Sequence, residues 1–435
     1  MRAEGAPNML RWAHLPECKA PPEGWSVERF TDIASVIAGQ SPPSETYNEK
    51  GDGLPFLQGN GDFSFKNPVA CSWCSAPVKT AHEGDTLISV RAPVGEVNRA
   101  DREYAIGRGL AAVRAVGSDP DFLYHALQRW RWCLQRVAQG TTFDAVTARH
   151  FGQLRVALPR EVPEQTAIAR ILDAVDTALE RTRAAGERAR EVRRAALHRF
   201  FYEALGETAY ADRPRRKLPP GWSLVATDLL LAEEPKNGMS PEAFSQPPGT
   251  PTFSIAAIRD GRVDLNNKDN LKYTRVSETV ARRFCVQRGD VLIVRGNANP
   301  DLVGKAGMVS VFPGGCIYPD IAKRVVFRTD PEPKVSPEFA VLAWNHAIVH
   351  NQVLRRAKTS NGTLKINNRD VKQIVMPVPP EKEQAQLVKI IAGVDAQIDA
   401  LTAVRVAQEQ LKRALMRDLL TGRVRVTNEI KVAAS

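Results

Sequence analysis

The sequence contains two long segments that are near copies of each other, and both have the pattern of a continuous helix. They span residues 164–205 and 381–420. Each begins just after a proline and is followed by a glycine, which is the usual punctuation of a helix. A chain with this sequence must therefore accommodate two matched helices, each about 60 Å long at the usual rise per residue. The copies align without a gap, with Gln165 on Gln384, Ile171 on Ile390, Asp176 on Asp395, Arg194 on Arg413 and Ala195 on Ala414.

Apolar residues recur along both helices with alternating spacings of three and four. Such a heptad pattern predicts a helix surface that packs against another helix. Each helix could pack on its own domain or on a second copy of the chain, but two matched helices in one chain favour packing against each other. If the chain folds back between them, the pair is an antiparallel coiled coil. The first copy presents Ile168, Ile171, Val175, Ala178, Ala185, Ala189, Val192 and Ala196, with polar Thr182 in one position, and the second presents Leu387, Ile391, Val394, Ile398, Leu401, Val404, Leu411 and Leu415.

A second repeated phrase, far from the helices, shows that the repeat unit is much longer than a helix. Pro-Pro-Glu-Gly-Trp-Ser ends at Ser26, and Pro-Pro-Gly-Trp-Ser ends at Ser223. A globular segment followed by a long helix therefore occurs twice. The sequence divides into a first globular segment (1–160), a first long helix (161–206), a second globular segment (207–379), a second long helix (380–425) and a tail (426–435). Trp25 and Trp222 could be stacking platforms, but the large area that a tryptophan buries and their presence in both copies favour core anchors.

The two globular segments share landmarks that mix strands and helices. A turn followed by a buried strand is expected at 84–91 and again at 289–295, and a further strand at 109–116 and 322–328. A helix is expected at 121–138 and 337–354, and a short strand leads into each long helix at 155–158 and 374–377. Because strands and helices do not strictly alternate, we expect each segment to be α+β.

The net charge of +11 is carried outside the long helices. Residues 164–205 hold eight Arg against seven Asp and Glu, and residues 381–420 hold six Lys and Arg against six acids. The excess positive charge therefore lies in the other segments, where a polyanion such as nucleic acid could use it. Basic surface that serves only solubility remains the alternative on charge alone.

The six cysteines do not have the arrangement of a disulfide framework, and Cys71 and Cys74 form a single CxxC without a second pair. A zinc site needs about four ligands, so we expect none here. The first 20 residues lack the continuous apolar core of a signal peptide, and no apolar run is long enough to span a membrane. A cytoplasmic location is expected.

Motifs for catalysis are missing. Gly304-Lys305 lacks the upstream Gly and the following Ser or Thr of a phosphate-binding loop. Neither the active-site tetrapeptide of amino-methyltransferases nor G-x-S-x-G occurs. Pro319-Asp320 followed by Glu332-Pro333-Lys334 imitates a PD…ExK nuclease, whose carboxylates hold a divalent cation. Pro333 stands where a central strand is required, so we interpret this stretch as a loop.

This layout resembles the specificity subunit of type I restriction–modification systems, over nearly the whole chain. The resemblance rests on the tandem order of globular segment and helix and on the Pro-Pro-Gly-Trp phrase that opens each half. It also rests on the proline-rich stretch with Glu and Gln before each helix, at 158–168 and 378–387. The first copy departs slightly, because Arg160-Glu161-Val162-Pro163 replaces an unbroken Pro-Pro.

The resemblance implies a function without catalysis in this chain. Each globular segment is a target-recognition domain that reads one half of a split double-stranded DNA target, and the paired helices hold the two domains apart. They also dock two modification subunits, which carry S-adenosylmethionine and methylate adenines. Restriction subunits that use ATP and Mg²⁺ join the larger complex, and this chain binds no cofactor or metal itself. Because the two segments differ between their landmarks, the target should be asymmetric.

Candidate DNA-binding residues are polar and basic side chains on the expected loops, since bases are read by Arg, Lys, Asn, Gln and hydroxyls and phosphates by cations. Any single one of them is more often only a solvated surface residue. In the first segment they are Gln58, Asn60, Arg91, Arg99, Arg102, Arg108, Thr141, Thr142 and Arg149, and in the second they are Arg295, Asn297, Asn299, Lys305, Lys323, Arg324, Lys358, Thr359, Asn361 and Lys365.

Two other classes of function compete with DNA recognition. A coiled-coil scaffold that binds only protein would show weak, salt-independent affinity for DNA, whereas neutralising phosphates gives a steep salt dependence. A self-contained metal-dependent nuclease or a methyltransferase would need the motifs that are missing. Cleavage by the purified chain with magnesium, abolished by Asp320→Ala, would identify the nuclease.

Overall fold

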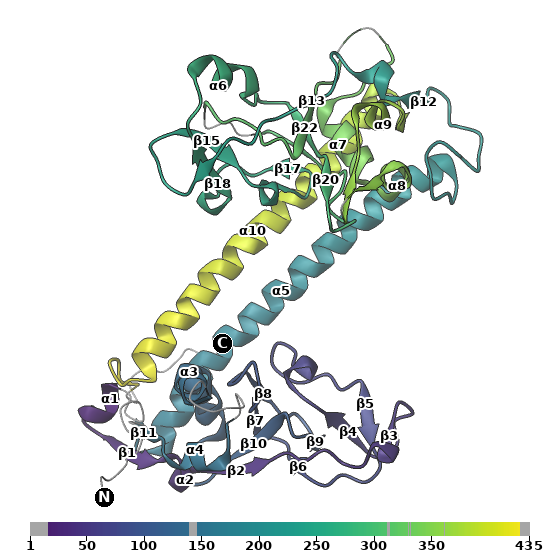
Figure 1. The fold of residues 1–435 in the computed structure, drawn as a ribbon. Helices are drawn as coiled ribbons and strands as arrows, with labels where there is room; N and C mark the ends of the chain where they lie inside the picture. The colour runs from purple at the N-terminus through teal and green to yellow at the C-terminus, as the bar shows by residue number, and fades with distance from the viewer. Residues whose placement is uncertain are drawn as a thin grey trace, which may run out of the picture. The chain divides into compact units, whose positions relative to one another are not determined.

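The computed structural model describes residues 16–138, 146–310, 314–328, 330, 332–360 and 362–426. It divides into two units, one formed by residues 1–185 with 401–435 and the other by residues 186–400. Each unit contains a globular segment and a portion of both long helices (Figure 1). Strands and helices are mixed in each, so the predicted α+β class is confirmed.

The two long helices are α5 (Val162–Leu205) and α10 (Glu381–Leu419), within a few residues of the expected bounds. In the first unit, Asp176 of α5 pairs with Lys412 of α10, and Arg183 of α5 pairs with Glu409. A later residue on α5 thus meets an earlier residue on α10. In the second unit, Arg193 of α5 pairs with Asp395 of α10.

The buried stripe on α5 matches the predicted heptad in part. Ile168 and Ala189 are buried as predicted, whereas Val192 is 57% exposed. Leu172, Leu179, Asp176 and Gly186 are also buried. The buried face therefore includes a charged residue and a glycine, which a search for apolar spacing passes over.

On α10 the predicted face is correct only near the start of the helix. Leu387 and Ile391 are buried, but Val404 and Leu411 are 47% and 51% exposed. The side chain of Lys412 is only 17% exposed, because its ammonium reaches an aspartate of α5. Lys412 therefore lies on the inner face of α10, where the apolar pattern had predicted its neighbour Leu411.

A buried glutamine at the start of each long helix explains the repeated Glu and Gln after proline. Gln165 donates to the Pro159 carbonyl (2.8 Å) and accepts from the Asp119 N–H (2.8 Å). Gln384 donates to the Pro379 carbonyl (2.9 Å) and accepts from the N–H of Ser336 (3.0 Å). Each amide thereby ties its long helix to the first turn of the helix that crosses the globular segment.

The first globular segment holds three sheets, in the orders β1-β11, β2-β10-β7-β8 and β3-β5-β4-β9-β6 (Figure 1). Its strands are β1 (Trp25–Arg29), β2 (Ala34–Ala38), β3 (Tyr47–Asn48), β4 (Leu54–Leu57), β5 (Ser72–Cys74), β6 (Thr80–Ala81), β7 (Thr86–Ser89), β8 (Val97–Arg99), β9 (Tyr104–Ile106), β10 (Leu110–Ala115) and β11 (Arg155–Pro159). Its helices are α1 (Pro16–Lys19), α2 (Phe30–Ile33), α3 (Pro120–Ala138) and α4 (Ala148–Gly152).

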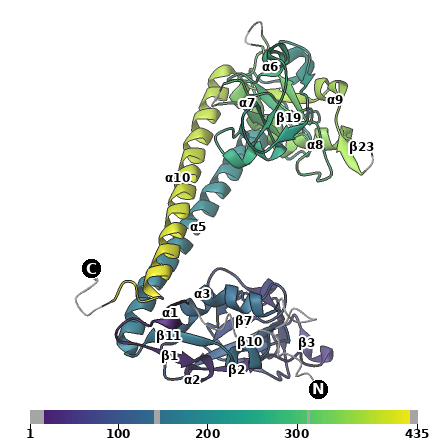
Figure 2. The ribbon, with the colours of Figure 1, turned by 60° about the vertical axis from the view of Figure 1, so that its left-hand side comes forward.

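The second globular segment holds four sheets, in the orders β12-β25, β13-β22-β19-β21-β17-β16, β14-β18-β15 and β20-β24-β23 (Figures 1 and 2). Its strands are β12 (Ser223–Ala226), β13 (Lys236–Asn237), β14 (Ala243–Phe244), β15 (Thr250–Phe253), β16 (Ile258–Arg259), β17 (Arg262–Val263), β18 (Leu271–Thr274), β19 (Val291–Val294), β20 (Gly296–Asn297), β21 (Ala306–Met308), β22 (Ala322–Val325), β23 (Lys358–Ser360), β24 (Thr363–Lys365) and β25 (Val375–Val378). Its helices are α6 (Glu278–Phe284), α7 (Pro337–Asn345), α8 (Ala347–Arg356) and α9 (Asn368–Lys372).

Both segments are built on the same central framework. Ser89 faces Leu110 across the β7–β10 pair, and Val294 faces Ala322 across the β19–β22 pair. The Val90 carbonyl accepts from the N–H of Val146, and the Arg295 carbonyl accepts from that of Ile366. Arg295 therefore corresponds to Val90.

One predicted helix is broken in two. The expected helix 337–354 is α7 followed by α8, with His346 between them in an extended conformation (φ −70°, ψ 145°). The His346 ring packs on Phe201 of α5 at 4.8 Å between centroids. In the first segment the corresponding α3 continues without a break. Trp25 and Trp222, expected to be core anchors, are 2% and 9% exposed.

In the part of the chain that the structure describes, no helix has both the length and the apolar character needed to cross a membrane.

Acid should destabilise the second unit through His350 on α8. Its ring is 6% exposed, and neither ring nitrogen has a hydrogen-bond partner among the described residues. Burial, with a smaller effect of Lys305, lowers the pKa of His350 to about 4. The unfolded chain therefore binds the proton more readily, and the stability held above pH 6.5 is lost as pH falls toward 4.

We predict that His350→Leu removes about 2 kcal/mol of the stability difference between pH 7 and pH 5, since its pKa shift is worth roughly that at pH 5. Denaturant unfolding at the two pH values measures it. The matched control is His82→Leu, because the His82 side chain is 56% exposed. Equal pH dependence of His350→Leu and the unmodified chain would contradict the prediction.

Candidate nucleic-acid interface

In the second unit, three short strands bring several of the predicted residues onto one small sheet. Asn297 on β20 faces Leu364 on β24, and Lys358 on β23 faces Lys365 on β24. Thr359 lies next to Lys358 on the same hairpin. Lys358, Thr359 and Lys365 are exposed, and Asn297 is partly exposed. Two segments separated by sixty residues of sequence therefore present cations, an amide and a hydroxyl together.

The base of this hairpin is held rigidly. The Ile366 N–H donates to the Arg295 carbonyl at 2.9 Å, and Ile366 itself is 3% exposed. A Cβ on Gly296 would come within 3.0 Å of the Leu364 carbonyl, so a glycine allows the two strands to approach. Gly362 has φ +70°, the left-handed conformation that glycine adopts readily in a tight turn. The hairpin tip is thus polar and its base is anchored in the core.

The loop after β20 is shaped by its own asparagines. The Asn297 side chain accepts from the N–H of Asn299 (2.8 Å), and the Asn299 side chain accepts from the N–H of Asp301 (2.9 Å). These turns use the acceptor oxygens of both amides and leave their NH₂ groups as donors. Such donors suit phosphate oxygens or the acceptor atoms of base edges.

Two of the predicted cations in this unit support the fold instead. Lys323 is 1% exposed, and its ammonium donates to Asn237 Oδ1 (2.6 Å) and to Asn368 Oδ1. Burial, and then the nearby Arg295, lower the pKa of Lys323 to about 8. Arg324 pairs with Glu233 (2.5 Å) and with Asp290 (3.5 Å). Neither side chain is presented to solvent as a free cation.

Lys305 is intermediate between these two groups. Its side chain is partly buried, and burial lowers its pKa. It lies with Asp260, Asp301 and Arg194 in the lining of a cavity of about 960 Å³ beside α5. Lys305 therefore lies partly buried in this cavity, whereas the hairpin lysines are exposed.

In the first unit, two predicted loops adjoin. The Gly107 N–H donates to the Leu57 carbonyl at 2.8 Å, and a Cβ on Gly109 would come within 2.4 Å of the Gln58 carbonyl. Glycines at these positions allow the two loops to touch. Gln58 and Arg108, both exposed, are thereby brought onto neighbouring loops, with Asn60 close in sequence and partly exposed.

The remaining predicted residues of the first unit are scattered. Arg91 and Arg149 are exposed, and Arg102 is an exposed neighbour of Asp101 at 3.7 Å. Thr141 and Thr142, like Asn361 of the second segment, lie outside the described residues.

Arg99 has a structural role that the sequence did not indicate. Its guanidinium contacts Asp121 of α3 (3.2 Å) and Asp173 of α5 (3.3 Å), and lies 4.4 Å from the centre of the Tyr124 ring. Its side chain is only 13% exposed. Arg99 therefore joins the globular segment to α5, a role distinct from that of a free cation for DNA.

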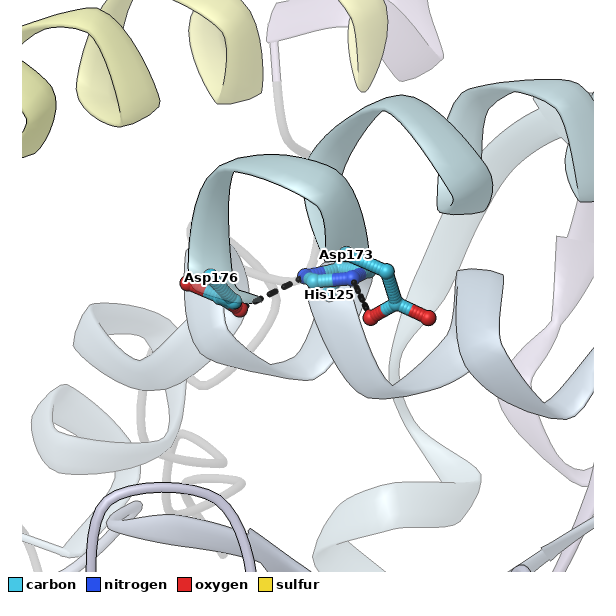
Figure 3. Close-up of side chains that lie close together, drawn as sticks. All are labelled: His125, Asp173 and Asp176. Atoms are coloured by element: carbon cyan, nitrogen blue, oxygen red, sulfur yellow. Dashed lines mark hydrogen bonds and ion pairs between the residues drawn. The ribbon is translucent and has the colours of Figure 1, made fainter. Parts of the chain in front are cut away.

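Among the described residues, one group of three side chains has ligand atoms close enough to hold a metal ion. His125, Asp173 and Asp176 have these atoms within 4.8 Å of one another (Figure 3). However, Lys412 Nζ lies 2.7 Å from Asp176, and Arg99 lies 3.3 Å from Asp173. Both carboxylates already have a cationic partner, so a divalent cation would be placed against two fixed positive charges.

The residues that imitate a nuclease motif have separate partners. Asp320 accepts a hydrogen bond from the Ser240 hydroxyl at 2.7 Å. Lys334 lies 3.8 Å from Glu332 and 3.3 Å from Glu381 at the start of α10. Lys334 therefore contacts the loop and the long helix, whereas Asp320 is bound to Ser240.

Comparison with known proteins shows what the first half of the chain is similar to. Residues 22–186 match the family model described as the Type I restriction modification DNA specificity domain. A putative type I restriction enzyme specificity subunit of Methanocaldococcus jannaschii is 38% identical over 165 residues, which are 37% of this chain and 38% of that protein. The first half of the chain is thus similar to DNA specificity domains of type I restriction–modification systems.

Longer matches extend the similarity to the rest of the chain. The type I restriction enzyme EcoKI specificity subunit of Escherichia coli K12 is 25% identical over 290 residues, 65% of this chain and 58% of that subunit. The StySPI specificity subunit of Salmonella potsdam is 21% identical over 437 residues, 94% of this chain and 91% of that subunit. The chain spans less than two thirds of the Methanocaldococcus and EcoKI proteins.

The fold also has a known counterpart. The crystal structure of the S subunit of the type I restriction–modification system from M. genitalium aligns with a TM-score of 0.60 at 15% identity, over 91% of this chain and 96% of that one. The predicted resemblance to type I specificity subunits is confirmed.

We predict that replacing both hairpin lysines, Lys358→Ala with Lys365→Ala, weakens DNA binding at every sequence. If each lysine contacts one phosphate, the slope of log K against log salt should fall by about 2. Fluorescence anisotropy of a labelled duplex over a salt series measures this slope. The matched control replaces Lys268 and Lys272, exposed lysines of the same unit. An unchanged slope in the hairpin variant would remove the hairpin from the interface.

Proposed function

We propose that this chain is the non-catalytic DNA sequence-recognition subunit of a type I restriction–modification complex. Residues 1–160 and 207–379 are its two target-recognition domains, and each reads one half of a bipartite, asymmetric target. The observation that carries the proposal is the common framework with different polar loops. The β7–β10 and β19–β22 pairs have the same register, whereas the hairpin in the second unit and the loops around Gln58 and Arg108 in the first present different side chains. Two recognition domains with the same framework but different polar side chains on their loops suit two different half-sites.

The long helices, 161–206 and 380–425, separate the readers as an antiparallel coiled coil. The alignment that places Gln165 on Gln384 also places Asp176 on Asp395 and Arg193 on Lys412. The two ion pairs between helices, Asp176 with Lys412 and Asp395 with Arg193, are therefore copies of each other. Such a relation is expected when two copies of a helix pack in opposite directions around a local two-fold axis.

Exposed apolar residues on the helices suit the docking of partner subunits. Ile390, Val404 and Leu411 of α10 are 49%, 47% and 51% exposed, at heptad-related positions, and Val192 of α5 is 57% exposed. Apolar surface of this kind on a helix indicates a protein contact. We assign it to two modification subunits, which carry S-adenosylmethionine, while restriction subunits supply ATP- and Mg²⁺-dependent steps. The complex acts in the cytoplasm, where its DNA substrate is.

The proposal is tested by assembling the purified chain with its cognate modification subunit. Native mass spectrometry should give two modification subunits per chain, and the complex should bind duplex DNA with a steep dependence on salt. The chain alone with Mg²⁺ should leave DNA intact. Salt-independent binding would favour a protein scaffold, and cleavage that Asp320→Ala abolishes would favour a nuclease.

Charge reversal tests the pairing of the helices. Asp176 and Lys412 have side chains 6% and 17% exposed, so Lys412→Asp alone leaves buried carboxylates unpaired and should cost about 3–5 kcal/mol. Combining it with Asp176→Lys restores the pair and should recover most of the loss, as measured by denaturant unfolding.

The matched control reverses the exposed pair of Arg190 and Glu187 on α5, whose side chains are 44% and 69% exposed. Reversal there should change stability by less than about 1 kcal/mol. A double Asp176 and Lys412 variant no more stable than Lys412→Asp would show that the helices do not depend on this pair.

A further inference from the structure

His125 of α3 is buried between two aspartates of α5. The His125 side chain is 0% exposed, and Figure 3 shows its ring between Asp173 and Asp176. Its Nε2 lies 2.9 Å from Asp173 Oδ1, and its Nδ1 lies 4.0 Å from Asp176 Oδ2. All three residues belong to the first unit, so this contact lies between the first globular segment and the long helix within one unit.

Charged groups surround the ring from every element packed against it. Arg99 of β8 contacts Asp173, and also Asp121 of α3. Lys412 of α10 contacts both oxygens of Asp176, at 2.7 and 2.9 Å, and the Gln128 side chain of α3 at 2.9 Å. Two cations thus balance the two carboxylates without any charge on His125.

The hydrogen bond to Asp173 determines which ring nitrogen carries the proton. An ionised carboxylate only accepts hydrogen bonds, so Nε2 must be the donor. Burial would raise the pKa of Asp173, but the hydrogen bond from His125 and the charge of Arg99 outweigh it and lower the pKa to about 2. Burial also lowers the pKa of His125. The ring is therefore neutral, and Nδ1 is left without a hydrogen-bond partner.

An unpaired, buried ring nitrogen costs stability, so this arrangement is not what folding alone would favour. The second unit supports the point. The N–H groups of Asp119 and Ser336 donate to the equivalent Gln165 and Gln384, which aligns His125 with Leu342. The helix alignment places Ala392 at the position of Asp173. The aligned positions in the second unit thus hold Leu342, which is partly buried, and Ala392, which is exposed, and neither side chain can form this hydrogen bond.

We propose that His125 is a positioning residue for DNA recognition: by donating from Nε2 to Asp173 it fixes α3, and with it the first target-recognition domain, on the long helix α5. This inference rests on the proposed function. A directional hydrogen bond between a helix of the reader and the long helix that carries it restrains rotation of the reader, which non-directional apolar contact would not do. Readout of the first half-site then depends on His125, and readout of the second does not.

The test uses the full chain assembled with its modification subunits. Discrimination is the ratio of methylation rates on the intact target and on a target with one base changed in either half-site. His125→Leu should lower discrimination at the first half-site by about tenfold, the order expected for one lost hydrogen bond to a charged group. Discrimination at the second half-site should be unchanged. His125→Gln, whose amide can still donate to Asp173, should restore most of the loss.

Controls separate positioning from folding. His125→Leu with Asp173→Ala places at both positions the residue types that the second unit has there, so it should fold and assemble yet remain as impaired as His125→Leu alone. His82→Leu, an exposed histidine of the same unit, should behave as the unmodified chain. Unchanged first-half discrimination in His125→Leu, or an equal loss at both half-sites, would overturn the inference. A complex whose unmodified chain recognises no split target would instead overturn the proposed function.

Discussion

The pairing of the long helices depends on two largely buried acid–base pairs, one within each unit. Asp176 with Lys412 and Asp395 with Arg193 lie on the inner faces of α5 and α10. The seam around them is poor in large apolar residues, since Gly186 is buried in it and Val404 and Leu411 point outward. Apolar area alone would define the register weakly there. Buried pairs contribute little net stability but penalise any register that separates the charges, and in this chain they supply the specificity of the packing.

Each globular segment is attached to the helices in two ways, one shared and one its own. The shared attachment is the glutamine at the helix start, Gln165 or Gln384, which accepts from the first turn of the crossing helix. The individual attachment is polar in both units but differs in burial. His125 reaches Asp173 inside the first unit, whereas in the second unit Arg262 reaches Asp399 from a side chain that is 45% exposed. Because the glutamine contact is shared, the two globular segments can differ in their other contacts with the long helices and still be held by the same interaction.

Much of this architecture could be predicted from the sequence, because repeats and periodicity are local signals. The two long helices, the α+β class and the core positions of Trp25 and Trp222 were predicted correctly. The inner face of the helices was predicted only in part, because Lys412 and Arg193 lie inside through partners far away in sequence. The break at His346 accompanies a contact with Phe201, which no local pattern encodes.

For the candidate interface, the sequence allowed the residue types and their location on loops to be predicted, but not how these residues are arranged in space. Lys358 and Lys365 are exposed as expected, but their pairing with the strand of Asn297 depends on a register between distant segments. Lys323 and Arg99 are cations in the expected loops and strands that the fold uses internally. A basic residue in a sequence does not indicate whether an acid or an amide elsewhere will bury it. The choice between a surface cation and a structural one therefore needs the tertiary structure.

The most direct test of the account is the identity of the DNA target. Cells that express this chain with its cognate modification subunit would be analysed by genome-wide mapping of methylated adenines. One motif with two different short half-sites separated by a gap of constant length is expected. A single contiguous motif, a palindrome, or half-sites whose separation varies would contradict the proposal that the chain carries two unlike readers joined by one pair of helices.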